Sequence, residues 1–76
     1  MKDKVLTVDN VGTVLQEARD EASMTREKLG SISKVSRQTI HNIEEGGGDV
    51  GIKKFIKSIN ALDKELVVRN KDIQKV

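Results

Sequence analysis

The polar side chains that follow Arg37 are spaced so that they share one face of a helix. Ile40 and Ile43 set the inward direction of that helix, because successive residues turn by about 100° around its axis. Arg37 then lies at the leading flank of the outward face, which carries Gln38, His41, Asn42 and Glu45. Arg can bond guanine O6 and N7 together, and Gln can bond adenine N6 and N7 together. The pattern predicts a helix that contacts base edges in a DNA major groove; an ordinary solvated helix face is the simpler alternative.

A second short helix precedes this one, and a tight turn separates the two. Thr25 and Ser36 are the predicted N-caps, because their side chains can accept hydrogen bonds from the free N–H groups of a helix start. Apolar residues spaced three apart mark a narrow core edge on each helix, and the expected core positions are Leu29, Ile32, Val35, Ile40 and Ile43. Two amphipathic helices joined by a few residues are typical of a helix-turn-helix.

The start of the first of these helices is a predicted contact for a DNA phosphate. Thr25 and Arg26 lie where free backbone N–H groups and the positive end of the helix favour an anion, and Arg26 adds a positive charge. A plain N-cap is the simpler reading of Thr25. Lys34 and Asn42 are weaker phosphate candidates.

Further helices are expected on both sides of this pair. Asp9 or Asn10 can cap a helix that runs to about Ala22, with the apolar set Val11, Val14, Leu15, Ala18 and Ala22. The glycines at 46–48 end the helix that begins at Arg37. Another helix covers about residues 52–62; its inner stripe is Ile52, Phe55, Ile56, Ile59 and Leu62, and its outer face carries Lys53, Lys54 and Lys57.

Two features predict how these elements are held together. Arg19 and Glu44 can form a bidentate ion pair that locks the first helix to the third, which is a structural role. Residues 65–69 form a β-branched run that predicts one strand, and a lone strand needs a partner. A chain of 76 residues buries only about 60% of its unfolded surface, so self-association is the remaining way to enlarge the core.

Composition excludes several classes of function. The chain has no Cys and a single His, which removes disulfides, thiol catalysis and a His/Cys metal site, so neither a metal nor a cofactor is expected. Phe55 is the only aromatic residue, which favours duplex DNA over single-stranded nucleic acid. The net charge of +2 is concentrated in the second half. No apolar run is long enough to span a membrane and no signal-peptide pattern opens the chain, so a cytoplasmic protein is expected.

With these residues in place, the chain resembles the phage-repressor (Cro-like, or XRE) helix-turn-helix family. The segments that carry the resemblance are Met24-Thr25-Arg26, Leu29-Gly30, Lys34-Val35-Ser36-Arg37, Thr39-Ile40 and Glu44-Glu45-Gly46. Within that family the glycine-rich loop, the helix ending in Ala61-Leu62-Asp63 and the trailing strand are most similar to HipB-type antitoxins. Together they cover about residues 9–70.

The resemblance implies an all-α, lambda-repressor-like bundle of four to five helices, with a short C-terminal strand that pairs with its copy in a dimer. The implied layout is an N-terminal arm at 1–8, a DNA-binding domain at 9–64, and a dimerisation strand and tail at 65–76, with the dimer contact at Leu66, Val67 and Val68. By resemblance, the residues that contact bases are Arg37, Gln38 and His41. The residues that contact phosphates are Thr25, Arg26, Ser36 and Asn42. Arg19 and Glu44 match the family's interhelical ion pair.

Three residues depart from the family pattern. Arg26 replaces the usual Gln and keeps an electrostatic role towards DNA. Lys34 stands where the turn usually has Gly, so a left-handed backbone there would be strained. Gly30 replaces Ala, which permits close packing but weakens its helix.

The expected function is a sequence-specific repressor, with no enzymatic activity, that binds a palindromic duplex operator as a homodimer. The sequence leaves open whether the chain is also the antitoxin of a HipA-like toxin kinase. A protein-interaction module or adaptor that never contacts DNA is the alternative of a different class.

Overall fold

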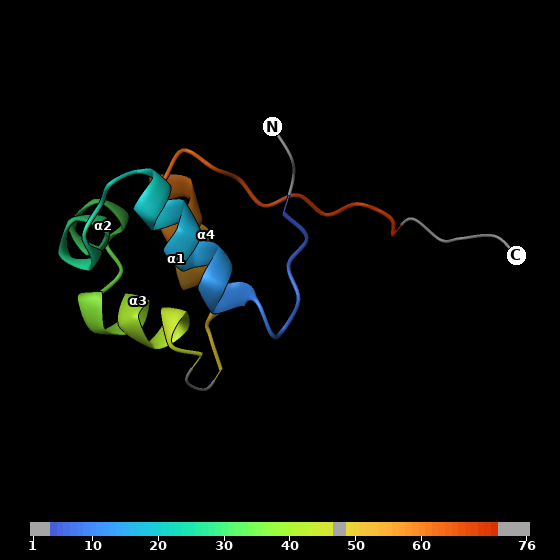
Figure 1. Ribbon diagram of the computed structural model, residues 1–76, viewed down its shortest axis with the longest axis horizontal. Coiled ribbons are helices and arrows are strands. Elements are labelled where there is room, and N and C mark those ends of the chain that lie inside the picture. Colours follow the sequence, from blue (N-terminus) through green and yellow to red (C-terminus); the bar gives the residue numbers. More distant parts are fainter. Residues whose placement is uncertain (1–3, 47–48, 72–76) are drawn as a thin grey trace, which may run out of the picture.

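The computed structural model describes residues 4–46 and 49–71, and that part of the chain is all-α. Four helices follow one another with short connections (Figure 1), namely α1 (Val11–Glu21), α2 (Arg26–Ser33), α3 (Arg37–Glu44) and α4 (Ile52–Ala61). The predicted helices are therefore confirmed, with ends that differ by a residue or two. None of the described helices is long and apolar enough to cross a membrane.

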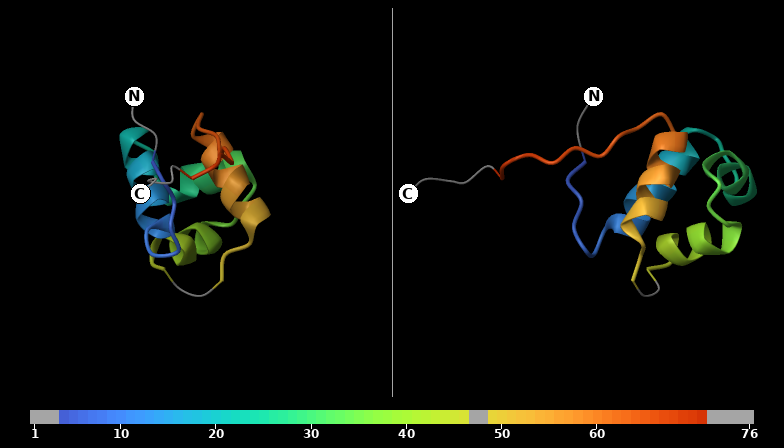
Figure 2. Two further views of the ribbon diagram at one scale, coloured as in Figure 1. Left: turned by 90° about the vertical axis from the view of Figure 1, so that its right-hand side faces the viewer. Right: turned by 180° about the vertical axis from the view of Figure 1, so that it is seen from behind.

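One small core joins the four helices. α1 packs against α3 and α4, and α2 packs against α3 and α4, and these are the main contacts between helices (Figure 2). The buried apolar side chains come from every helix and from the connections, and they are Leu15, Ala18, Leu29, Val35, Ile40, Ile43, Phe55, Ile59 and Leu62. Two of the helices, α2 and α3, meet at one side of this core and form the helix-turn-helix.

Two hydroxyl side chains begin the helices of this pair, as the sequence predicts. The Thr25 Oγ1 accepts a hydrogen bond from the Lys28 N–H at 3.0 Å, and the Ser36 Oγ accepts one from the Thr39 N–H at 3.1 Å. Each bond satisfies a backbone donor that has no partner within its own helix. The starts of α2 and α3 are thus fixed by local sequence.

Asn10 occupies the N-cap position of α1, but its side chain does not bond to that helix. Its Oδ1 instead accepts from the Thr7 N–H at 2.8 Å, and its Nδ2 donates to the Val5 carbonyl at 3.0 Å. The predicted N-cap position at Asn10 is confirmed, but Asn10 makes no side-chain cap bond to α1, because the arm before the helix competes for its amide. This exchange ties the arm to the start of α1.

The turn between α2 and α3 contains a left-handed residue at the position where the sequence predicts strain. Lys34 has φ 63° and ψ 27°, and its N–H donates to the Gly30 carbonyl at 2.9 Å. A Cβ built on Gly30 would lie 2.8 Å from the Val35 carbonyl oxygen, closer than real Cβ atoms approach. Gly30 therefore lets the turn fold back tightly onto α2.

Several predicted core positions are on the surface. Ile32 is 46% exposed and Ile52 is 63% exposed, and Ala22 is also exposed. Ile32 borders a shallow surface hollow between the end of α2 and α4, and Ile52 is the first residue of α4. The other predicted core residues of the helix-turn-helix, which are Leu29, Val35, Ile40 and Ile43, are buried.

Both the glycine loop and the C-terminal segment are described only in part. Gly46 has φ 75°, the left-handed conformation expected of a glycine that ends a helix, while residues 47–48 lie outside the described residues. The described residues contain no strand, and 65–71 run away from the bundle as irregular backbone (Figure 1). A strand at 65–69 is therefore not formed within one chain, since no neighbouring strand is available to it among the described residues. Residues 72–76 of the predicted tail lie outside the described residues.

Candidate nucleic-acid interface

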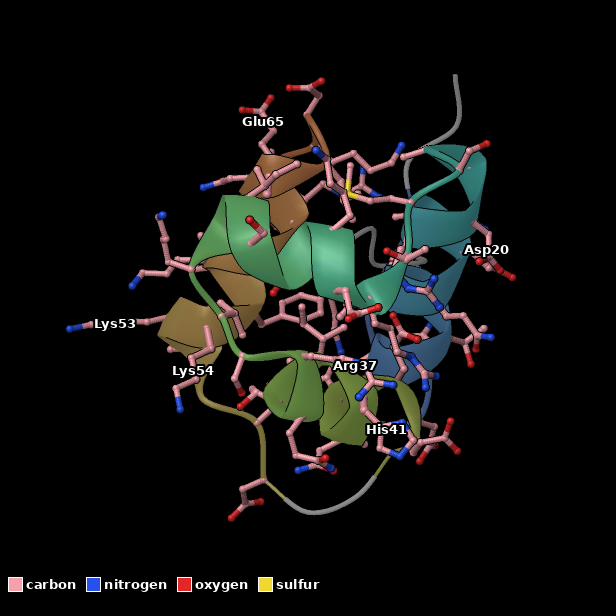
Figure 3. All side chains as sticks on the ribbon, turned by 90° about the vertical axis from the view of Figure 1, so that its left-hand side faces the viewer. Asp20, Arg37, His41, Lys53, Lys54 and Glu65 are labelled. Carbon is pink, nitrogen blue, oxygen red and sulfur yellow. The ribbon has the colours of Figure 1, made fainter. Side chains whose placement is uncertain are left out.

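The outward face of α3 is polar and open. Ile40 is fully buried and Ile43 is 2% exposed, so the opposite side of the helix faces away from the core. That side carries the exposed side chains of Arg37, Gln38 and Asn42, and the half-buried His41. Figure 3 shows the Arg37 and His41 side chains close together along α3.

Two amide side chains on this face are bonded to each other. The Gln38 Nε2 donates to the Asn42 Oδ1 at 3.1 Å, one helical turn further on. The bond orients the Gln38 amide along the helix surface, and both groups keep further donors and acceptors for a ligand. Arg37, in the first turn of α3, is the cation that projects beside this pair.

The predicted phosphate contacts gather around the starts of α2 and α3. Thr25 and Ser36 are exposed N-caps, and Lys34 is exposed in the turn between them. The Ser36 hydroxyl is also bonded to the Thr39 Oγ1 at 2.8 Å. Helix starts of this kind present free N–H groups and a positive dipole end to an anion.

Arg19 and Glu44 lie against each other and join α1 to α3. The Arg19 Nε donates to the Glu44 Oε2 at 2.7 Å, and its Nη2 donates to Glu44 Oε1 at 2.9 Å. The Arg19 Nη1 also donates to the Met24 carbonyl at 2.8 Å, which fixes the loop before α2. The Glu44 side chain is fully buried, so this is a bidentate pair in a largely desolvated site.

The electrostatics of this pair favour its charged form. Burial of the Glu44 carboxyl acts to raise its pKa, but the hydrogen bonds from Arg19 and Arg26 outweigh it, so the pKa lies below the usual value of 4.5. The hydrogen bond to Glu44 raises the pKa of Arg19 above its usual value. The carboxylate therefore remains ionised in the folded chain at neutral pH.

Arg26 extends this network towards the face of α3, which sequence reasoning missed. Its Nε donates to Glu44 Oε1 at 2.9 Å, its Nη2 to the Glu45 Oε2 at 3.2 Å, and its Nη1 to the His41 Nδ1 at 2.7 Å. A guanidinium group has five N–H donors, so two remain for another ligand. The sequence shows that residues 41, 44 and 45 share one side of a helix. That Arg26 on α2 faces them follows only from the way the two helices cross.

Two exposed lysines lie at the start of α4, and the sequence alone assigned them no site. Lys53 and Lys54 project outward from the first turn of α4 (Figure 3). They belong to the stretch of chain that follows α3 and its glycine loop.

The described residues form neither a metal site nor a catalytic group around His41. Within residues 4–46 and 49–71, no group of three or more His, Cys, Asp or Glu side chains could hold a metal ion. The His41 ring is bonded to an arginine, which is not the arrangement of a general base with a nucleophile. What this site offers is an array of cations, amides and helix starts for an extended polyanion.

Comparison with known proteins gives the family to which this chain belongs. Residues 15–68, more than half of the chain, match the family described as Helix-turn-helix (HTH_3). The chain therefore belongs to this XRE/Cro-like helix-turn-helix family, whose members are DNA-binding domains rather than enzymes. No curated protein matches the sequence.

Two solved structures are similar to this chain in fold. A chain described as "MDT Protein" has a TM-score of 0.81 and 15% identity, over 93% of this chain and 100% of its own. A chain from "Structure of HipA-HipB-O2-O3 complex" has the same TM-score of 0.81, 15% identity and coverage of 93% and 100%. At this identity the likeness shows that the fold is shared.

Proposed function

We propose that this chain is a sequence-specific repressor that binds a palindromic DNA operator as a homodimer. The observation that carries the proposal is the face of α3: Arg37 and Gln38 are exposed in its first turn, while Ile40 is fully buried behind them. Residues near the start of a recognition helix are the ones that contact base edges. Arg37, Gln38 and His41 are the proposed base contacts.

The proposed phosphate contacts surround this face. Thr25, Ser36, Asn42 and Lys34 are all exposed, and Arg26 keeps two N–H donors beyond its contacts with α3. Such contacts fix the position of the protein on the duplex without choosing its sequence. They make the affinity depend steeply on salt.

The C-terminal segment supports the proposed dimer. Leu66 lines a groove of about 540 Å³ between α1 and α4, whereas Val67 is 72% and Val68 100% exposed. Two copies of residues 65–69, paired as strands across a two-fold axis, would place Val67 of both chains on one face of the ribbon and Val68 of both chains on the other. Half-site centres would then lie about 10–10.5 base pairs apart, the repeat that two-fold helix-turn-helix dimers impose.

Selection of bound sites from a random duplex pool tests this function directly. We expect a palindrome, and Arg37→Ala should relax the choice at one base in each half-site at a cost of about 1–3 kcal/mol. A loss that is equal on every sequence would make Arg37 a phosphate contact instead. An adaptor that does not bind DNA would give no selected sequence and no salt-dependent gel shift.

A second role, as the antitoxin of a HipA-like toxin, is supported by one observation. The chain shares its fold with a chain solved in a HipA–HipB complex. We propose that a toxin partner would bind away from α3, so that DNA and toxin could be held together. Co-purification of a second polypeptide, encoded beside this chain, would support this role, and purification of the chain alone from its native operon would contradict it.

A further inference from the structure

The hydrogen bond between Arg26 and His41 determines where the imidazole ring carries its proton. The Arg26 Nη1 lies 2.7 Å from the His41 Nδ1. A guanidinium has only donors and does not lose its proton in proteins, so Nδ1 must accept the bond with its lone pair. A ring that accepts at Nδ1 carries its single proton on Nε2.

Arg26 is itself held in place, which limits how the ring can rearrange. Its Nε is bonded to Glu44 and its Nη2 to Glu45, on the same side of α3 as the imidazole. The Glu44 side chain is fully buried and also bonded to Arg19, so the carboxylate that orients Arg26 has little freedom. The guanidinium thus presents one fixed N–H to Nδ1.

We propose that Arg26 is a positioning residue that makes His41 a hydrogen-bond donor towards DNA. The inference rests on the proposed function, in which His41 contacts a base edge. Among the described residues none is bonded to the His41 Nε2, so this N–H is the polar group that the ring can offer to a ligand.

The direction of this hydrogen bond limits the bases that His41 can select. In the major groove an N–H donor suits guanine O6 and N7, adenine N7 and thymine O4, and it meets another donor at the cytosine amino group. At the position that His41 contacts, the operator should therefore present an acceptor. A histidine protonated on Nδ1 would offer an acceptor at Nε2 and could select cytosine.

The proton position can be measured on the free protein, because His41 is the only histidine of the chain. Two-bond 1H–15N NMR at neutral pH should show a protonated Nε2 and an unprotonated Nδ1. Arg26→Met should convert the ring to a mixture of both forms. Arg37→Met is the matched control: it removes the same charge from the same surface and makes no bond to the ring, so it should leave the proton on Nε2.

Two NMR results would overturn the proposal. The first is a wild-type ring that is protonated on Nδ1 or is already a mixture, and this result does not depend on any variant folding. The second is a folded Arg26→Met protein, checked by circular dichroism, whose ring is indistinguishable from that of the wild type.

Duplex selection with the same proteins tests the consequence for recognition. At the position where His41→Ala loses preference, Arg26→Met should reduce discrimination by about three- to tenfold, the worth of one neutral hydrogen bond. Unchanged discrimination at that position in a folded Arg26→Met protein would refute the donor role. If the wild type selects no duplex, the proposed function fails, and the donor role towards DNA fails with it. The NMR result still decides whether Arg26 determines the position of the proton on the His41 ring.

Discussion

Lys34 carries backbone strain in the turn that joins α2 to α3. Its φ of 63° is a conformation in which an L side chain crowds the following carbonyl, at a cost of roughly 1–2 kcal/mol that glycine does not bear. Lys34→Gly should raise the free energy of unfolding by about 0.5–1 kcal/mol, since part of the gain is lost to the flexibility of glycine in the unfolded chain. Urea unfolding monitored by circular dichroism measures the change.

The same substitution elsewhere in α2 serves as a control. Lys28 is exposed within the helix, so Lys28→Gly should lower the free energy of unfolding by about 1 kcal/mol. Equal signs for the two variants would show that Lys34 is not strained. If Lys34 contacts a phosphate as proposed, Lys34→Gly should also flatten the plot of log affinity against log salt by about one unit.

Glu44 is the residue on which the junction of α1, α2 and α3 depends. Glu44→Gln would leave Arg19 and Arg26 facing a neutral amide in a buried site, and we expect a loss of about 3–5 kcal/mol. Chemical unfolding of the two proteins gives the difference directly. Glu17→Gln, at an exposed ion pair with Lys4, should cost less than about 1 kcal/mol and is the matched control.

The lowered pKa of Glu44 also predicts how stability changes with acid. The carboxylate contributes its full stabilisation above the usual pKa of 4.5 and loses it as the pH falls through the lower pKa of the folded state. The gap in unfolding free energy between wild type and Glu44→Gln should therefore be constant at neutral pH and shrink below about pH 4.5. A gap that stays constant as the pH falls well below 4.5 would contradict the assignment.

At the scale of elements, the start of α1 lies directly on the end of α3. A Cβ built on Gly12 would meet the backbone carbonyl oxygens of Ile43 and Glu44, the second at 2.7 Å. Gly12→Ala should therefore push α1 away from α3 and cost about 1–3 kcal/mol, despite the better helix propensity of alanine. The control is Thr13→Ala on the exposed side of the same turn, which should stay within about 0.5 kcal/mol of the wild type.

Gly12→Ala also distinguishes an effect on stability from an effect on DNA binding. The moved helix packs against α3 but carries none of the proposed DNA contacts itself. A thermal melt should therefore shift down in Gly12→Ala, while the folded fraction keeps its salt dependence in a gel shift. An unchanged melting temperature would show that the two helices can separate at little cost.

The helices could be predicted because their signals are local. Thr25 and Ser36 cap their own helices, and Leu29, Ile40 and Ile43 repeat at helical spacing, so each segment carries the information needed to place it. The core prediction for Ile32 is wrong because two apolar residues three apart do not fix which edge of a short helix is covered.

The rest depends on contacts between distant segments. The Asn10 amide can cap α1 or bond the arm, and only the path of the arm decides between them. The sequence shows that Arg26 is a cation at a helix start, which predicts a phosphate contact. Its bonds to His41 and Glu45 follow from the angle at which α2 meets α3. The strand at 65–69 needs a second chain before it can form.

At the scale of the whole molecule, the proposed dimer depends on the valines of the C-terminal segment. Val67→Asp with Val68→Asp should give a folded monomer in analytical ultracentrifugation, because both side chains are exposed in the single chain and play no part in its core. Val8→Asp in the N-terminal arm is the matched control, since Val8 is 95% exposed and should tolerate the charge without loss of the dimer.

Removal of residues 65–76 should have the same effect on assembly. The truncated chain lacks Leu66 and so exposes part of the groove between α1 and α4, which makes it less stable as well as monomeric. A dimer that survives both the truncation and the double aspartate variant would place the interface on the helices instead. Operator affinity should fall in the monomers, since each would then hold a single half-site.

The extended run at 65–71 also has a consequence for the lifetime of the protein. After Leu66 the chain is irregular and Val67 and Val68 are exposed, and exposed irregular backbone is the form that proteases cleave most readily. Dimerisation would bury this stretch, and dissociation of the dimer on dilution would expose it again. We therefore expect the rate of cleavage there to rise as the chain becomes scarcer, so that low abundance would hasten its own decline.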